Sequence, residues 1–295
     1  MSARAKAGDY LSLVKFSHSI FALPFALSSA WLAAGGLPAP RLLLLVIGCC
    51  VAARTAAMGF NRLVDARVDA ANPRTAQREI PAGVLRPGAV ALFVALSCAL
   101  FVGLAAWISP LCGWLSPLVL AVLLGYSFAK RFTWAAHLWL GVALGLAPLG
   151  AWIAVRGELV WGELVAPALL AGAVLTWVAG FDLIYSCQDA DFDREQGLRS
   201  IPARFGVARA LGVSRLLHVG TVGLLLGFWQ VAGLSWIYAA AIALAAALLV
   251  WEHRLVAPDD LSKVDMAFFT LNGWVGVGLF VGLALDLQLL SGVGT

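Results

Sequence analysis

Two short acidic stretches carry the residue types and the spacing most suited to chemistry in this chain. Asp65 and Asp69 are four residues apart in the first stretch, as are Asp189 and Asp193 in the second. On a helix this spacing places two side chains on one face, one turn apart, where like charges repel. A bound cation relieves that repulsion, and carboxylate oxygens suit Mg²⁺, which usually also carries substrate phosphates. The two pairs therefore predict a metal-bridged diphosphate site.

The elements that must position these carboxylates are membrane-spanning helices. The 295-residue chain is 62% hydrophobic and 12% charged, with a mean hydropathy of +0.91, whereas a soluble domain carries roughly a quarter charged residues. Nine apolar stretches, most of them about 18–25 residues long, match the length that a helix needs to cross a bilayer. We predict an all-α integral membrane protein, a single domain over residues 1–295. Its nine transmembrane helices lie near 16–35, 41–61, 88–108, 111–129, 135–155, 163–186, 208–232, 234–252 and 264–287.

The distribution of charge predicts the orientation of the chain in the membrane. The net charge is +4, and of the 20 Lys and Arg residues all but Arg41, Arg54 and Arg156 fall on the side that holds the N-terminus. Because basic loops stay in the cytoplasm, we expect a cytoplasmic N-terminus. Both acidic stretches then face the cytoplasm, where soluble diphosphates and Mg²⁺ are found.

The loops that follow the second and sixth spans share one order of residues. Each begins with an acidic pair and continues into arginines around a proline-containing turn, with Arg74 and Arg78 in the first loop and Arg204 in the second. This order predicts two pseudo-repeated halves with acidic motifs at 61–69 and 182–193, and a site built between them. The alternative is that the arginines only satisfy the positive-inside rule.

Two charged residues inside the predicted spans lie deeper than the motifs. Arg54 precedes Asn61 by seven residues, and Asp182 precedes Asp189 by the same number. Seven residues are about two helical turns, so each points along the face of its motif. Arg54 could receive an anionic group, because a guanidinium binds a carboxylate through two hydrogen bonds. The alternative is a structural salt bridge between Arg54 and Asp182.

Tyr126 and Lys130 form a further pair, four residues apart, at the cytoplasmic end of the fourth span. Lys130 could hold a phosphate, or its side chain could simply extend to the interface. The five cysteines and four histidines show no metal-ligand spacing. They therefore predict no zinc or redox site.

These motifs together resemble the UbiA superfamily of intramembrane aromatic prenyltransferases, and most of all its 4-hydroxybenzoate polyprenyltransferase branch. The first motif of that family, NDxxDxxxD, is matched at 61–69 with Arg62 in a position where an acidic residue is common. Its YxxxK motif is matched by Tyr126 and Lys130. The second motif of the branch is matched by Asp182, Asp189, Asp191 and Asp193. The opening segment 15–25 is also typical of the branch, so the resemblance covers essentially the whole chain.

The resemblance implies helices around a central cavity, which a polyprenyl diphosphate enters from the bilayer. It implies Mg²⁺ held by Asp65, Asp69, Asp189 and Asp193, and substrate contacts from Arg54, Asn61, Arg74, Arg78, Tyr126, Lys130, Asp191 and Arg204. Arg54 would hold the carboxylate of an aromatic acceptor, while Asp182 would orient the acceptor or help to remove its ring proton. The metal would stabilise the departing diphosphate as a Lewis acid. A cavity walled by apolar and aromatic side chains would keep water from the allylic cation.

The resulting hypothesis is a Mg²⁺-dependent enzyme of the cell inner (plasma) membrane with its active site toward the cytoplasm. It joins a polyprenyl group to an aromatic acid, 4-hydroxybenzoate, ortho to the hydroxyl, in ubiquinone or related quinone biosynthesis. We expect no nucleic acid partner. One alternative keeps this chemistry and changes the acceptor to a precursor of the futalosine route to menaquinone. Another, of a different class, is a cation or organic-ion transporter, although the arginines beside the carboxylates would hinder a passing cation.

Overall fold

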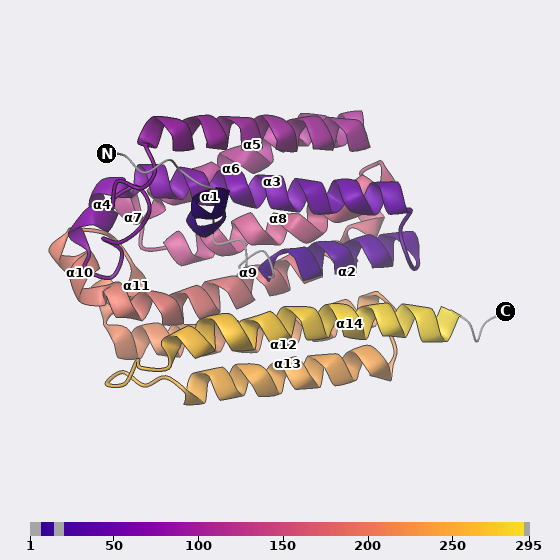
Figure 1. Cartoon of the computed structure of the whole chain (residues 1–295). Helices are drawn as coiled ribbons and strands as arrows, with labels where there is room; N and C mark the ends of the chain where they lie inside the picture. Colours follow the sequence, from indigo (N-terminus) through magenta and orange to yellow (C-terminus); the bar gives the residue numbers. More distant parts are fainter. Residues whose placement is uncertain (1–6, 15–20, 292–295) are drawn as a thin grey trace.

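The computed structural model describes residues 7–14 and 21–291, and the regular elements of this part of the chain are all helices (Figure 1). The long helices are α3 (Pro40–Val64), α5 (Pro87–Ile108), α6 (Pro110–Gly125), α8 (Ala136–Arg156), α9 (Val165–Ser186), α12 (Val207–Val231), α13 (Trp236–Arg254) and α14 (Asn272–Ser291). The shorter α-helices are α1 (Ala7–Leu13), α2 (Leu23–Ala34), α4 (Ala66–Ala71), α7 (Ala129–Phe132), α10 (Ala190–Glu195) and α11 (Ile201–Phe205). Three 3₁₀ segments, η2 (Tyr126–Phe128), η3 (Trp161–Glu163) and η4 (Cys187–Asp189), and a π-helix, η5 (Met266–Leu271), complete the order.

Eight helical segments among the described residues are long and apolar enough to cross a membrane, and they correspond to eight of the nine predicted spans. This confirms the predicted all-α membrane class. The ninth predicted span, 16–35, falls partly on residues 15–20, which lie outside the described ones, as does part of the opening segment 15–25. The described remainder contains α2, an apolar helix of 12 residues. The count of nine and the orientation of the N-terminus stay predictions.

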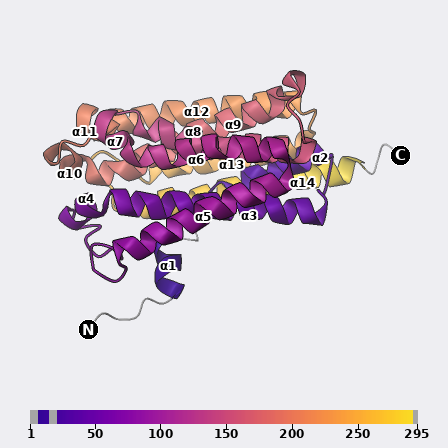
Figure 2. The same ribbon diagram turned by 90° about the horizontal axis from the view of Figure 1, so that it is seen from above.

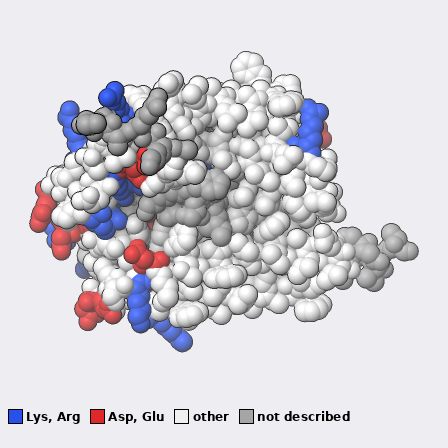
Figure 3. Space-filling model, in the orientation of Figure 1, with Lys and Arg blue, Asp and Glu red and all other residues white. Residues whose placement is uncertain are grey.

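Charged side chains gather at the two ends of the helical bundle, and an uncharged band separates them on the face shown in Figure 3. The larger group lies at the end where α4, α7, α10 and α11 are found (Figures 1 and 2). A charge at the centre of a membrane helix costs at least about 2.5–3.5 kcal/mol, so the uncharged band is the part suited to face lipid. Both acidic motifs therefore belong to one membrane surface.

The two halves of the bundle are packed differently. Helices α9, α12, α13 and α14, with α2, enclose a dense apolar core in which Trp177, Phe181, Phe228 and Tyr238 are almost fully buried. The rings of Trp177 and Phe181 meet edge to face with their centroids 5.0 Å apart, a favourable arrangement for aromatic pairs. Helices α3, α5, α6 and α8 instead leave a cavity between them. The C-terminal half is therefore a rigid support, and the N-terminal half provides space for a ligand.

A buried polar network fastens the C-terminal helices to one another. The side-chain amide of Asn272 donates to Oε1 of Glu252 (3.0 Å) and to the carbonyl oxygens of Ala267 (3.0 Å) and Phe268 (3.2 Å). These carbonyls belong to the π-helix η5, whose wider turn leaves backbone groups to be satisfied by other donors. Trp177 Nε1 in turn donates to Oδ1 of Asn272 (2.6 Å). The buried carboxyl group of Glu252 thus has a structural role.

Two glycines bring α8 and α9 into direct backbone contact. A Cβ atom on Gly141 would lie 2.3 Å from the carbonyl oxygen of Leu175, and one on Gly145 would lie 2.8 Å from that of Ala171. Glycines four residues apart are a common device for close helix approach in membranes, where packing rather than the hydrophobic effect holds helices together. The two helices therefore lie close enough for short polar side chains to meet across their interface.

The contact at Gly141 generates a prediction about stability. Gly141→Ala should lower the free energy of unfolding by about 1–3 kcal/mol or more, because the added methyl group meets a backbone oxygen that cannot rotate away. Gly150→Ala in the same helix is the control, since a Cβ atom there meets nothing within 4 Å. Thermal unfolding of the purified variants in detergent measures the difference. Equal melting temperatures for the two variants would contradict the proposed contact.

Candidate active site

The first acidic motif sits where a long helix changes into a short one. Asp65 lies at the junction of α3 and α4 with φ −93° and ψ 4°, and Asp69 lies on α4. The backbone N–H of Asp69 donates to the carbonyl of Asp65 (2.7 Å), so the helical turn continues through the junction. Asn61 Nδ2 donates to Oδ2 of Asp65 (2.9 Å). The motif therefore presents its carboxylates one turn apart at the end of the membrane helix.

The second motif repeats this local arrangement. Asp189 lies between α9 and α10 with φ −102° and ψ 8°, close to the angles of Asp65, and Asp193 lies on α10. Helices α4 and α10 are both six residues long. Asp69 and Asp193 are both buried, with side chains 8% and 3% exposed. Burial at this level requires a partner for each carboxylate.

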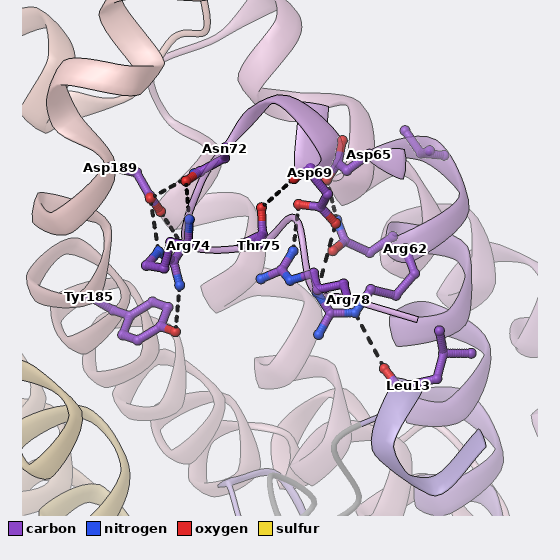
Figure 4. Close-up of polar contacts among 12 residues, drawn as sticks. Leu13, Arg62, Asp65, Asp69, Asn72, Arg74, Thr75, Arg78, Tyr185 and Asp189 are labelled. Carbon is purple, nitrogen blue, oxygen red and sulfur yellow. Dashed lines mark hydrogen bonds and ion pairs between the residues drawn. The ribbon is translucent and has the colours of Figure 1, made fainter. Parts of the chain in front are cut away.

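The loop after the first motif supplies cations to both motifs (Figure 4). Arg78 donates to Oδ1 of Asp69 (2.6 Å). Arg74 reaches across to the second motif, where its guanidinium binds both oxygens of Asp189, and Nε lies 3.0 Å from Oδ1. Asn72 Nδ2 also donates to Oδ1 of Asp189 (3.0 Å). This one loop therefore joins two motifs that are far apart in the sequence.

Helix α7 supplies the other two cations from consecutive residues. Lys130 donates to Oδ2 of Asp193 (3.0 Å). Arg131 donates to Oδ1 of Asp65 (3.1 Å) and to the carbonyl of Val64 (2.8 Å). Each of the four motif carboxylates thus has a basic partner, and the buried Arg62 adds a further positive charge beside Asp69. The structure brings together the two motifs as the sequence predicts, and adds Arg131 and Asn72 to them.

One carboxylate oxygen in this cluster has no donor. Oδ2 of Asp69 is buried and accepts no hydrogen bond from the described residues, and NH1 of the buried Arg62 lies 4.0 Å from it. A hard cation such as Mg²⁺ would satisfy this oxygen, so the donor set suits the metal. Among the described residues no three acidic, His or Cys side chains converge on one point. A metal held by both motifs would therefore require these carboxylates to leave their basic partners.

An apolar cavity of about 530 Å³ lies next to the charged cluster, between α3, α5, α6 and α8. Among the described residues, the polar side chains that line it are Arg54, Asn61, Ser116 and Tyr126, and the cavity extends to Trp161 of η3, beyond the opposite end of α8. Most of its walls are aliphatic, so most Trp and Phe residues of the chain lie elsewhere. The predicted cavity is present, and the described residues that line it come mainly from α3, α5, α6 and α8. Its shape suits a long apolar chain whose polar end lies at the cluster.

The two deeper charged residues do not bind each other. Among the described residues Arg54 forms no ion pair, and its buried Nε has no hydrogen-bond partner. Asp182 instead contacts His137 of α8, whose Nδ1 lies 2.7 Å from its Oδ2. The alternative of a structural Arg54–Asp182 salt bridge is therefore not what the structure contains. Arg54 is left as an uncompensated cation in the wall of an apolar cavity.

Two predicted site residues are not brought to the cluster. Asp191 is 86% exposed and pairs with Arg194 (2.8 Å), because on helix α10 it points away from the face that carries its neighbour Asp193. Arg204 of α11 is also exposed, and its guanidinium lies over the ring of Phe205, 5.2 Å from the centroid. The two loops thus share an arginine pattern in sequence, but the arginines of the first loop contact the acidic cluster and Arg204 of the second loop does not.

Besides Asn72, sequence reasoning missed three residues of the site. Arg131 adjoins Lys130, and a basic pair at the end of a span could have indicated it. His137 lies four and eight residues before Gly141 and Gly145, so it shares their face toward α9. Tyr185 accepts a hydrogen bond from NH1 of Arg74 (3.0 Å) and lies beneath its guanidinium. No local pattern marks Tyr185.

Comparisons with known proteins agree with this fold and site. Residues 22–274 match the UbiA prenyltransferase family. The chain is 30% identical over 285 residues to the 4-hydroxybenzoate octaprenyltransferase of Hydrogenovibrio crunogenus, covering 94% of this chain and 96% of that protein. The apo structure of a UbiA homolog from Aeropyrum pernix K1 superposes with a TM-score of 0.83 at 35% identity, covering 91% of this chain and 98% of that one. A UbiA homolog from Archaeoglobus fulgidus bound to GPP and Mg²⁺ gives a TM-score of 0.69 at 18% identity, with coverages of 94% and 99%.

The fold and the site define a multi-pass membrane enzyme that transfers prenyl groups. The chain belongs to the UbiA prenyltransferase family. This membership confirms the resemblance seen in the motifs and favours the enzyme over the transporter alternative.

The environment of Asp65 generates a prediction about titration. Burial raises the pKa of the Asp65 carboxyl to about 6, an effect that the Arg131 guanidinium opposes and the Asp69 carboxylate reinforces. In the metal-free protein Asp65 should therefore be ionised at pH 7.5 and mostly protonated at pH 5. Infrared difference spectra between these values should show a protonated carboxyl band that is absent from Asp65→Asn. The same band in both proteins would contradict the assignment.

Proposed function

We propose that this enzyme transfers a polyprenyl group from polyprenyl diphosphate to an aromatic acid, 4-hydroxybenzoate, at the carbon ortho to its hydroxyl. The observation that carries the proposal is Arg54, a cation without an ion pair in the wall of an apolar cavity. An anionic group must compensate it, and a carboxylate matches the two-pronged guanidinium. The name of the Hydrogenovibrio relative supports this acceptor.

The charged cluster is proposed to bind the diphosphate together with Mg²⁺. The metal would be held by Asp65, Asp69, Asp189 and Asp193, and the Mg²⁺ and GPP bound by the Archaeoglobus homolog support this role. When bound, the metal supplies Lewis acidity that stabilises the departing diphosphate. As the carboxylates turn to the metal, their former partners Arg74, Arg78, Lys130 and Arg131 become free to bind diphosphate oxygens.

In this proposal the carboxylates exchange their basic partners for Mg²⁺, and the basic side chains exchange the carboxylates for diphosphate. Few buried charges are then left without a counterion. In the ligand-free cluster the carboxylates and the basic side chains neutralise each other. When Mg²⁺ and diphosphate enter together, each set receives a new counterion, whereas either ligand alone leaves one set without a partner. Isolated charges in a partly buried site are costly. We therefore infer that Mg²⁺ and diphosphate bind cooperatively.

The residues below the cluster are proposed to bind the acceptor. Arg54 and Asp182 each lie two helical turns, about 10.5 Å, deeper than Asn61 and Asp189. Arg54, Asn61 and Tyr126 all line the cavity. The acceptor would thus lie beneath the diphosphate with its carboxylate on Arg54 and its ring toward the allylic carbon. The aliphatic walls exclude water from the allylic cation.

This chemistry places the enzyme in quinone biosynthesis, because a prenylated hydroxybenzoate is the carbon skeleton of a ubiquinone precursor. The bacterial relative supports a location in the inner membrane, and the positive-inside rule supports an active site that faces the cytoplasm.

The proposal predicts the product directly. Membranes that contain the protein, supplied with Mg²⁺, polyprenyl diphosphate and a panel of aromatic acids, should release diphosphate and form a prenylated lipid from 4-hydroxybenzoate. Asp65→Asn and Asp189→Asn should each lower kcat at least about 100-fold, because each removes a ligand of the metal that would stabilise the departing diphosphate. Mass spectrometry of the lipid identifies the acceptor. Product from a different acid would correct the acceptor, and wild-type turnover in either variant would remove the metal role.

The role of Arg54 can be tested separately from that of the cluster. Arg54→Ala should raise KM for 4-hydroxybenzoate by about 10- to 100-fold, the loss expected for a charge-assisted hydrogen bond of about 1.5–3 kcal/mol. KM for the prenyl diphosphate should stay unchanged. A matched acceptor without the carboxylate, such as 4-hydroxybenzyl alcohol, should react equally with both proteins. If Arg54→Ala still prefers 4-hydroxybenzoate to 4-hydroxybenzyl alcohol as strongly as the wild type does, this role is contradicted.

A further inference from the structure

His137 and Asp182 form a hydrogen-bonded pair inside the membrane region, and of the two residues only Asp182 belongs to a family motif. Nδ1 of His137 lies 2.7 Å from Oδ2 of Asp182, and the two side chains are 1% and 16% exposed. An ionised carboxylate only accepts hydrogen bonds, so Nδ1 must carry the hydrogen. Nε2 of His137 is buried and has no hydrogen-bond partner among the described residues. A neutral imidazole leaves only a lone pair unsatisfied there, whereas an imidazolium would leave a buried N–H without an acceptor.

The packing of α8 on α9 fixes this pair. Gly145 faces the backbone of Ala171 and Gly141 faces that of Leu175, so the two helices run antiparallel at close range. His137 lies one turn further along the same face of α8, and its side chain reaches Asp182, which lies about two turns beyond Leu175 on α9. The imidazole is therefore held by a rigid interface.

The second oxygen of the same carboxylate remains open. Oδ1 of Asp182 accepts no hydrogen bond from the described residues, and it is not among their buried unsatisfied atoms. Neither His137 nor Asp182 is among the residues that line the cavity, but Leu140, one turn after His137 on α8, and Tyr126 both line it. The pair thus lies beside the space proposed for the acceptor, with one carboxylate oxygen held and the other free.

We propose that His137 is a positioning residue that holds Oδ2 of Asp182 so that Oδ1 can take the ring proton of the acceptor. This inference rests on the proposed function. The allylic C–O bond breaks and its electron pair leaves with the diphosphate, after which a ring π pair forms the new C–C bond. The C–H pair at that carbon then returns to the ring, and the proton passes to Oδ1 of Asp182. His137 stays neutral throughout, and its Nδ1–H continues to donate a hydrogen bond to Oδ2 of Asp182.

Two amide variants separate this role from a general structural one. His137→Asn places an amide nitrogen near the position of Nδ1 and keeps the donor, whereas His137→Gln places it near Nε2 and loses the donor. The substrates are 4-hydroxybenzoate and the same acid deuterated at both positions ortho to the hydroxyl. If Oδ1 is well placed, loss of the ring proton is fast and does not limit the rate. A misplaced base makes this step slow and exposes an isotope effect.

We expect the wild type and His137→Asn to show no ring-deuterium isotope effect on kcat and similar turnover. His137→Gln should lower kcat by about 10- to 100-fold, the order expected for a misplaced catalytic group, and should show the isotope effect. KM for the prenyl diphosphate should be the same in all three. Equal kcat in both variants, or a loss in His137→Gln without an isotope effect, would overturn the role of His137. A wild type that forms no product from any aromatic acid would instead overturn the proposed function, and the inference with it.

Discussion

The pairing of four carboxylates with four cations at the edge of the apolar bundle is the interaction on which the rest of the structure depends. Two aspartates one turn apart repel each other, and their burial makes that repulsion more costly. Arg74 and Arg78 from one loop, and Lys130 and Arg131 from α7, remove this cost without a ligand. Because these contacts cross between the motifs, they also fix the two halves of the site relative to each other.

The division of the bundle into a dense half and a hollow half serves this cluster. The core around Trp177 and Phe181 and the buried Asn272–Glu252 network hold the C-terminal helices, so that α9 presents Asp182 and Asp189 from a rigid support. The cavity on the other side of α8 is apolar, and among the described residues that line it the one Lys or Arg is Arg54. The charged side chains are thus found where the diphosphate and the acceptor carboxylate would lie. The prenyl chain would meet mainly aliphatic walls.

The sequence predicted the features that depend on local spacing, and missed those that depend on how helices meet. Hydropathy located eight of the described spans, and the spacing of Asp65 and Asp69 indicated a shared face. The partner of Asp182 could not be predicted, because it is set by the register of α8 on α9. The exposed position of Arg204 was missed for a related reason, since a repeated sequence pattern does not specify which loop folds back over the site.

A crystal structure with Mn²⁺ in place of Mg²⁺ and an unreactive prenyl thiolodiphosphate tests the central claim, that both acidic motifs form one site by exchanging their basic partners. Anomalous scattering should place Mn²⁺ in contact with the aspartates of both motifs, with Arg74 and Lys130 moved from Asp189 and Asp193 onto diphosphate oxygens. A diphosphate bound while all four ion pairs remain intact, or Mn²⁺ confined to one motif, would contradict the account.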